Sequence, residues 1–139
     1  MDFAPGEMIH RPLAQMTKES RVHFLIILLI AIHVLAGVFW AGTTLAIARS
    51  GGAGAQKLFR PQMGAATLAV LAGFALWGIL HRGPMGPMEE TLAIGAVCAI
   101  AAAGVQGAFK RGNGVGAQRV AAALLTVTVI CMAIARYVR

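Results

Sequence analysis

Residues 21–49 read RVHFLIILLIAIHVLAGVFWAGTTLAIAR, and this stretch decides the fold. Between its terminal arginines it is apolar except for two histidines and two threonines. A hydrocarbon core about 30 Å thick needs about 20 apolar helical residues, so this run is long enough to span a membrane. His33 lies about 18 Å from Arg21 at the helical rise per residue. Because an ionisable side chain is expensive at that depth, His33 is the first candidate functional residue.

The composition of the whole chain is typical of a membrane protein. Of its 139 residues, 58% are hydrophobic and 12% are charged, whereas a soluble domain carries about 25% charged residues. Lys and Arg number 12 against 5 Asp and Glu, which gives a net charge of +7. This excess is expected of segments that flank membrane spans and face anionic lipid. No basic stripe with interleaved aromatic residues is present, so we predict a lipid bilayer and no nucleic acid as partner.

Three further apolar segments follow the first, and breaks rich in glycine or proline separate them. The breaks are SGGAGAQ (50–56), HRGPMGPMEE (81–90) and RGNGVGAQ (111–118). This pattern predicts an all-α integral membrane protein, an antiparallel four-helix bundle with short loops. The predicted parts are an N-terminal interfacial segment (1–20) and a bundle (21–139) with helices at about 21–49, 62–82, 88–110 and 118–137.

Charges and aromatic residues give only a weak indication of orientation. Each predicted membrane face carries six of the 12 Lys and Arg residues, so the positive-inside rule favours neither. All 5 acids lie on the face with the termini, which favours that face being outside a bacterial-type inner membrane. Trp40, Trp77 and Tyr137 fall near helix ends and are interpreted as an interfacial aromatic belt.

Small residues predict how the helices meet. The third helix carries Gly95, Ala99, Ala103 and Gly107 at a spacing of four, and such a stripe lets helix backbones approach closely. One interpretation is tight packing inside a single bundle. The other is contact with a second copy or a partner subunit, which would make the protein a homo-oligomer.

His33 opens a face of the first helix that also contains Gly37 and Trp40. A histidine beside a niche of small residues can seat a planar macrocycle, with the imidazole as axial ligand. These three residues therefore form a predicted haem b site. The alternative is a neutral structural histidine that is hydrogen-bonded to Thr126 or Thr128, which lie at comparable depth in the fourth helix.

His23 and His81 are a second possible ligand pair. The first helix enters from the face with the termini and the second returns to it, so both histidines lie near that face. His33 is then about 15 Å deeper than His81 and cannot share one iron with it. A haem between His23 and His81 would lie close to the surface. A haem on His33 would be five-coordinate, differently ligated or shared between subunits.

The turn HRGPMGPM (81–88) also contains soft ligands. The imidazole of His81 and the thioethers of Met85 and Met88 suit Cu(I), which predicts an alternative copper site. All carboxylates are predicted at the surface and no nucleophile lies beside a base. The sequence therefore identifies no catalytic residue and argues against hydrolytic chemistry, and any enzyme activity is expected to be that of an oxidoreductase.

The run HVLAGVFWAGTTLAIAR (33–49), with a histidine seven residues before Trp-Ala-Gly, resembles the first helix of small four-helix proteins related to the copper-resistance protein D family. It is also similar to the bacterial membrane protoporphyrinogen oxidase, and FRPQMGAATLAVLAGF (59–74) resembles the start of the following helix in these proteins. The resemblance covers about residues 28–80 and implies a b-type haem or a copper-linked role, with His33 as the matching position. The oxidase pattern has a membrane-embedded lysine on a later helix, whereas Lys57 and Lys110 lie at predicted helix ends. The resemblance therefore implies haem binding rather than protoporphyrinogen oxidation.

These observations predict a haem b-binding membrane redox protein that exchanges electrons with quinol or a respiratory partner subunit. A copper-handling protein and a non-catalytic accessory subunit of a larger complex are the alternatives.

Overall fold

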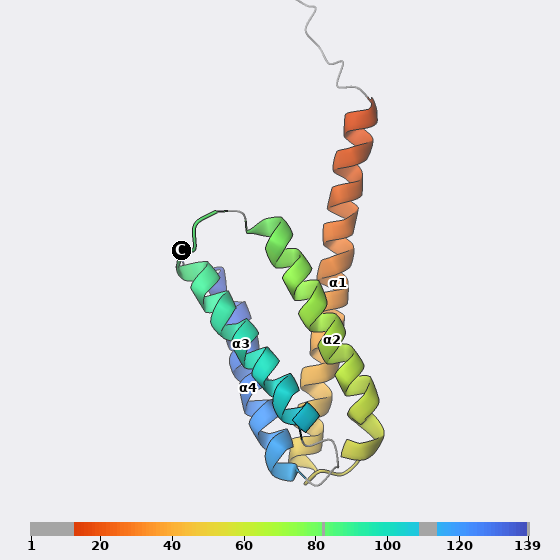
Figure 1. The fold of residues 1–139 in the computed structure, drawn as a ribbon, viewed down its shortest axis with the longest axis vertical. Coiled ribbons are helices and arrows are strands. Elements are labelled where there is room, and N and C mark those ends of the chain that lie inside the picture. The colour runs from red at the N-terminus through yellow and green to blue at the C-terminus, as the bar shows by residue number, and fades with distance from the viewer. Residues whose placement is uncertain (1–12, 82, 109–113, 139) are drawn as a thin grey trace, which may run out of the picture.

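The computed structural model describes residues 13–81, 83–108 and 114–138. This part of the chain forms four helices, each of which contains a segment long and apolar enough to cross a membrane. They form an antiparallel membrane bundle, which confirms the predicted fold class (Figure 1). The helices are α1 (Leu13–Arg49), α2 (Ala55–Leu80), α3 (Pro87–Ala108) and α4 (Val115–Ala135).

Helix α1 is longer than the sequence predicted. It begins at Leu13 rather than Arg21, so part of the expected interfacial segment continues the helix, and residues 1–12 lie outside the described part. No glycine or proline occurs between Leu13 and Gly37 to interrupt it. Its 37 residues measure about 55 Å. Figure 1 shows its N-terminal half extending beyond the other three helices, and its apolar side chains there are exposed for contact with lipid.

Helix α2 begins at Ala55 rather than at about residue 62, where the sequence predicted its start. Pro61 lies inside the helix, where its missing N–H leaves the carbonyl of Lys57 without the usual helical donor. The turn from α1 is made by three glycines, Gly51, Gly52 and Gly54, with φ of 68°, 92° and 80°. These left-handed conformations cost glycine little and other residues much more.

The helices pack as two antiparallel pairs, α1 with α2 and α3 with α4. Helix α1 also packs against α4, whereas α2 and α3 touch only sparingly and lie apart toward their connecting turn in Figure 1. The core between them consists mainly of alanine, which lets the backbones approach closely. The buried core cluster contains Trp40, Ala65, Ala66, Ala69, Ala99, Ala102, Ala121 and Leu125.

The small residues of α3 are used within the chain. A Cβ atom on Gly95 would lie 3.1 Å from the Cβ of Cys131, so any larger residue there would force α4 to shift slightly. The stripe at a spacing of four rotates off the interface, because a helix turns every 3.6 residues, and Ala103 and Gly107 are only half-buried. A homo-oligomer through this stripe stays a prediction. The buried positions of α3 are Gly95, Ala99, Ala102 and Gln106.

Candidate functional site

His33 is half-buried and joins α1 to α2. Its Nδ1 lies 2.7 Å from the carbonyl oxygen of Ala69. Because a carbonyl oxygen only accepts hydrogen bonds, Nδ1 carries the proton, and Nε2 of the neutral ring is left with its lone pair. The ring lies over Gly73, where a Cβ atom would be only 2.9 Å from the Cε1 of His33. A backbone carbonyl and an absent side chain on α2 therefore fix the orientation of this imidazole.

The threonine partners proposed for a structural His33 were wrong. The hydroxyl of Thr126 donates to the carbonyl of Ala122 at 2.8 Å, within its own helix. The hydroxyl of Thr128 donates to the carbonyl of Gly95 at 2.9 Å, across to α3. Helix α4 thus directs Thr128 toward α3, and the acceptor for His33 comes from α2.

The predicted niche beside His33 contains free space. A Cβ atom on Gly37, one turn after His33, would have nothing within 4 Å. Trp40, one turn further, is 2% exposed, and its indole N–H donates to the Oε1 of Gln106 at 2.7 Å. Its assignment to an interfacial aromatic belt was therefore wrong, because the ring lies in the core. Its contact with a cofactor stays a prediction.

The space over Gly73 gives a first testable prediction. In Gly73→Ala the new methyl group forces the His33 ring to move and weakens its bond to Ala69, which we expect to lower the free energy of unfolding by about 1 kcal/mol relative to a matched Gly→Ala control. Gly64→Ala is the matched control on the same helix, since its Cβ meets nothing within 4 Å. Because alanine favours a helix over glycine by about 0.5–1 kcal/mol, the control is expected to be neutral or more stable. Denaturant titration in detergent measures the stability of both variants. A Gly73→Ala protein as stable as the control would contradict the close packing of the His33 ring against Gly73.

The structure gives the other two histidines different surroundings. His23 is exposed on the extended part of α1. His81 ends α2, and its ring stacks on Trp77 with centroids 4.7 Å apart and planes at 25°. Figure 1 shows α1 and the end of α2 diverging toward this face of the bundle. The surface-proximal pair of haem ligands stays a prediction.

The predicted copper ligands lie along the turn between α2 and α3. Met85 is exposed, whereas Met88 is half-buried in the first turn of α3. Between them the N–H of Gly86 donates to the Oε2 of Glu89 at 3.0 Å, which caps α3. In the described part of the chain, no three His, Cys, Asp or Glu residues are grouped as metal ligands. The copper site also stays a prediction.

A buried group of polar side chains, which we call the glutamine cluster, was not foreseen from the sequence. The hub is Gln106, whose Oε1 accepts from Trp40 and whose Nε2 donates to the Oγ1 of Thr44 and the Oε1 of Gln118, both at 3.0 Å. Gln62 donates through Nε2 to Thr44 at 3.2 Å. All four helices contribute to this cluster. Its members are Trp40, Thr44, Gln62, Gln106 and Gln118.

The hydrogen bonds of the cluster are nearly complete. The hydroxyl of Thr44 donates to the carbonyl of Trp40 at 2.7 Å and accepts from two glutamines, so its one proton and both lone pairs are used. Gln62 is 1% exposed, and its Oε1 has no partner among the described residues. A polar network that joins four helices inside an apolar bundle favours one register of those helices.

Comparisons with protein-family models, with curated proteins and with solved structures find no match to this chain. The fold and the buried polar contacts therefore define its class, a multi-pass membrane protein built as a four-helix bundle.

Proposed function

We propose that this protein binds haem b through His33 and serves in membrane electron transfer. The observation that carries the proposal is the hydrogen bond from the Nδ1 of His33 to the carbonyl of Ala69. A histidine that ligates a metal usually donates its other N–H to a backbone carbonyl or carboxylate, which fixes the tautomer and orients the ring. In His33 this second interaction is in place and leaves Nε2 for the iron.

The surroundings of the imidazole suit a planar group. Gly37 offers open space one turn along α1, and the neighbouring side chains of Val34 and Val38 are exposed and apolar. A porphyrin on Nε2 would be accommodated on the outer side of the α1–α2 pair, against lipid or a second copy of the chain. Haem b bound there would supply one-electron transfer. The protein would orient the iron through His33 and exclude water with the apolar flank of α1.

The depth of His33 bears on the electron partner. A redox group inside the hydrocarbon region is reached by lipid-soluble carriers, so quinol or a respiratory subunit in the same membrane is the proposed partner. The proposed location is a bacterial-type inner membrane, with the termini outside. His33 contacts α2 at Ala69 and Gly73, which precede His81 by two or more turns of that helix. This separation supports an iron that His33 and His81 do not share.

The absorption spectrum of the purified protein tests the proposal. Protein expressed with ample haem precursor is expected to show a Soret band that shifts on reduction with dithionite, together with the sharp α band of a b-type haem. A haem-to-protein ratio near one per chain, or one per two chains for a shared site, is expected from the pyridine haemochrome. Protein that is folded, fully supplied and free of a Soret band would overturn the proposal.

A further inference from the structure

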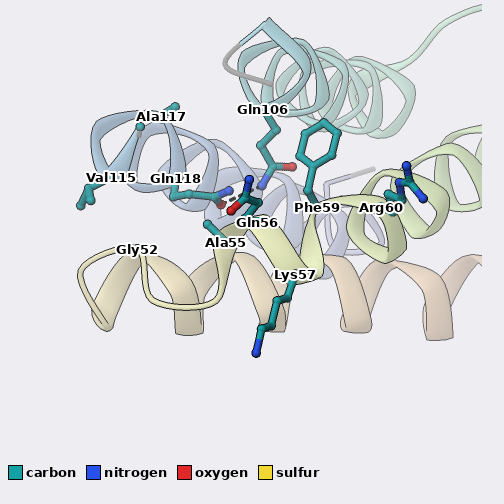
Figure 2. A pocket seen from close by; sticks show the side chains of 11 residues that line it. Gly52, Ala55, Gln56, Lys57, Phe59, Arg60, Gln106, Val115, Ala117 and Gln118 are labelled. Atoms are coloured by element: carbon teal, nitrogen blue, oxygen red, sulfur yellow. Dashed lines mark hydrogen bonds between the residues drawn. The ribbon is translucent and has the colours of Figure 1, made fainter. Parts of the chain in front are cut away.

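A polar pocket opens at the end of the bundle opposite the end of α4 and the start of α3. Its volume is about 330 Å³. Gly52, Gly114, the starts of α2 and α4 and the outer edge of the glutamine cluster form its walls (Figure 2). The lining residues are Gly52, Ala55, Gln56, Lys57, Phe59, Arg60, Gln106, Gly114, Val115, Ala117 and Gln118.

Two helix N-termini meet at this pocket. Helix α2 starts after Gly54 and α4 starts after Gly114, and neither cap residue has a side chain to satisfy the first N–H groups. The amide of Ala55 donates to the carbonyl of Gly52 at 3.1 Å, and the helical hydrogen bonds begin with Leu58, to Gly54, and Gln118, to Gly114. The amides of Gln56 and Lys57 in α2, and those of the first three residues of α4, come before these bonds. Free N–H groups and the positive end of each helix dipole therefore face the same space, an arrangement that attracts anions.

A buried side chain provides the second, independent indication of a ligand. Gln118 is 8% exposed and lines the pocket. Its Oε1 accepts from Gln106, whereas its Nε2 has no partner among the described residues. In Figure 2 the amides of Gln56, Gln106 and Gln118 are directed toward one another within the pocket. The two protons of this amide are available to an acceptor in the pocket, and an anionic oxygen is the strongest one.

The charges around the pocket have one sign. Lys57 and Arg60 line it, directed outward from the amides in Figure 2, and no carboxylate is among the lining residues. The acids in the described part of the chain, Glu19, Glu89 and Glu90, belong to the opposite end of the bundle. The positive field of the two cations and two helix starts is therefore not neutralised locally.

From this geometry we propose that the pocket binds a phosphoryl group. The phosphoryl oxygens accept from the Nε2 of Gln118 and from the free N–H groups that begin α2 and α4, while Lys57 and Arg60 balance the charge. At the end of membrane-spanning helices this pocket would face the headgroup layer, where an anionic phospholipid and free inorganic phosphate present the same phosphoryl oxygens to it. This binding site is separate from His33, which lies near the middle of α1, and does not depend on haem.

Two binding measurements on the full chain, delipidated in a neutral detergent, test the proposal and separate the two sources. Native mass spectrometry compares retention of phosphatidylglycerol with that of phosphatidylcholine. Thermal unfolding compares inorganic phosphate with chloride at equal ionic strength. Preference for phosphatidylglycerol assigns a lipid headgroup, whereas stabilisation by phosphate assigns the free anion. Wild-type protein that shows neither would overturn the proposal.

Matched variants locate the binding. Lys57→Ala/Arg60→Ala is expected to weaken binding about tenfold, because it removes two positive charges from the surroundings of the pocket. Lys18→Ala/Arg21→Ala removes the same charge from the other end of α1 and is expected to bind like wild type. An equal loss in both variants would show general electrostatic attraction and overturn the proposed site.

Gln118→Glu tests the amide itself. The carboxylate keeps an oxygen for Gln106 but replaces the free donor with a negative charge, so binding is expected to fall at least tenfold. Unchanged binding in Gln118→Glu would overturn the assignment of this side chain. If this variant does not fold, the paired cation variants, which change only exposed residues, decide the outcome.

Discussion

His33→Ala is expected to remove haem from the purified protein, whereas His23→Ala and His81→Ala retain it. The reason is the geometry of His33, whose Nδ1 is held by Ala69 at 2.7 Å so that only Nε2 is left to ligate. We expect the Soret absorbance per chain to fall at least tenfold in His33→Ala and to change little in the other two variants. The pyridine haemochrome assay, normalised to protein, provides the measurement.

A structural effect of His33→Ala can be separated from the loss of a ligand. Alanine also removes the hydrogen bond to Ala69, so the variant is expected to unfold more easily by about 1 kcal/mol. Free imidazole added during reconstitution is expected to restore a b-type spectrum, because it supplies the missing nitrogen without restoring the hydrogen bond. Retention of haem in His33→Ala, with loss in both His23→Ala and His81→Ala, would instead favour the surface-proximal pair.

The fold class could be predicted from the sequence because each membrane helix is recognisable from its own segment. An uninterrupted apolar run such as 21–49 must span the bilayer as a helix, because lipid offers no partner to an unpaired backbone group. The predicted start of this helix at Arg21 was wrong, because residues 13–20, although more polar, are mostly good helix formers. The start of α2 was also wrong, because Pro61 is tolerated inside a helix near its beginning.

The contacts of His33 and the glutamine cluster could not be predicted in the same way, because they join residues from different helices. The depth of His33 is readable from the sequence, but its acceptor is a backbone carbonyl at Ala69, and any residue type has a carbonyl. The cluster of Gln62, Gln106 and Gln118 was missed because each helix contributes one glutamine. One signal was available: all three interrupt apolar helices close to the same membrane face. Only the packing of α1 against α4 as well as α2 shows that they meet.

Among substitutions in the glutamine cluster, Gln106→Leu is expected to cause the largest loss of stability. This substitution removes three hydrogen bonds and leaves the indole N–H of Trp40, which is 2% exposed, without a partner. Hydrogen bonds between membrane helices contribute about 0.6 kcal/mol each, and an unpaired buried donor costs about 1–3 kcal/mol, so we expect a loss of about 2–4 kcal/mol. Unfolding in mixed micelles with rising dodecyl sulfate measures it. Gln56→Leu, at an exposed position of the same residue type, is the control and is expected to change stability little.

A double-mutant cycle separates the hydrogen bond from the shape of the side chain. Trp40→Phe removes the indole donor, so the Oε1 of Gln106 loses its partner in that variant. The double variant has neither the indole N–H nor the amide, so no buried group of this pair is left unpaired. If the orphaned donor dominates the cost, Trp40→Phe/Gln106→Leu is destabilised by less than the sum of the two single changes, with a coupling of about 1 kcal/mol or more. Strictly additive losses would show that Gln106 acts through packing alone. Because this hub touches α1 and α4 from α3, such coupling would also show that polar contacts, and not the alanine faces alone, hold the four helices in register.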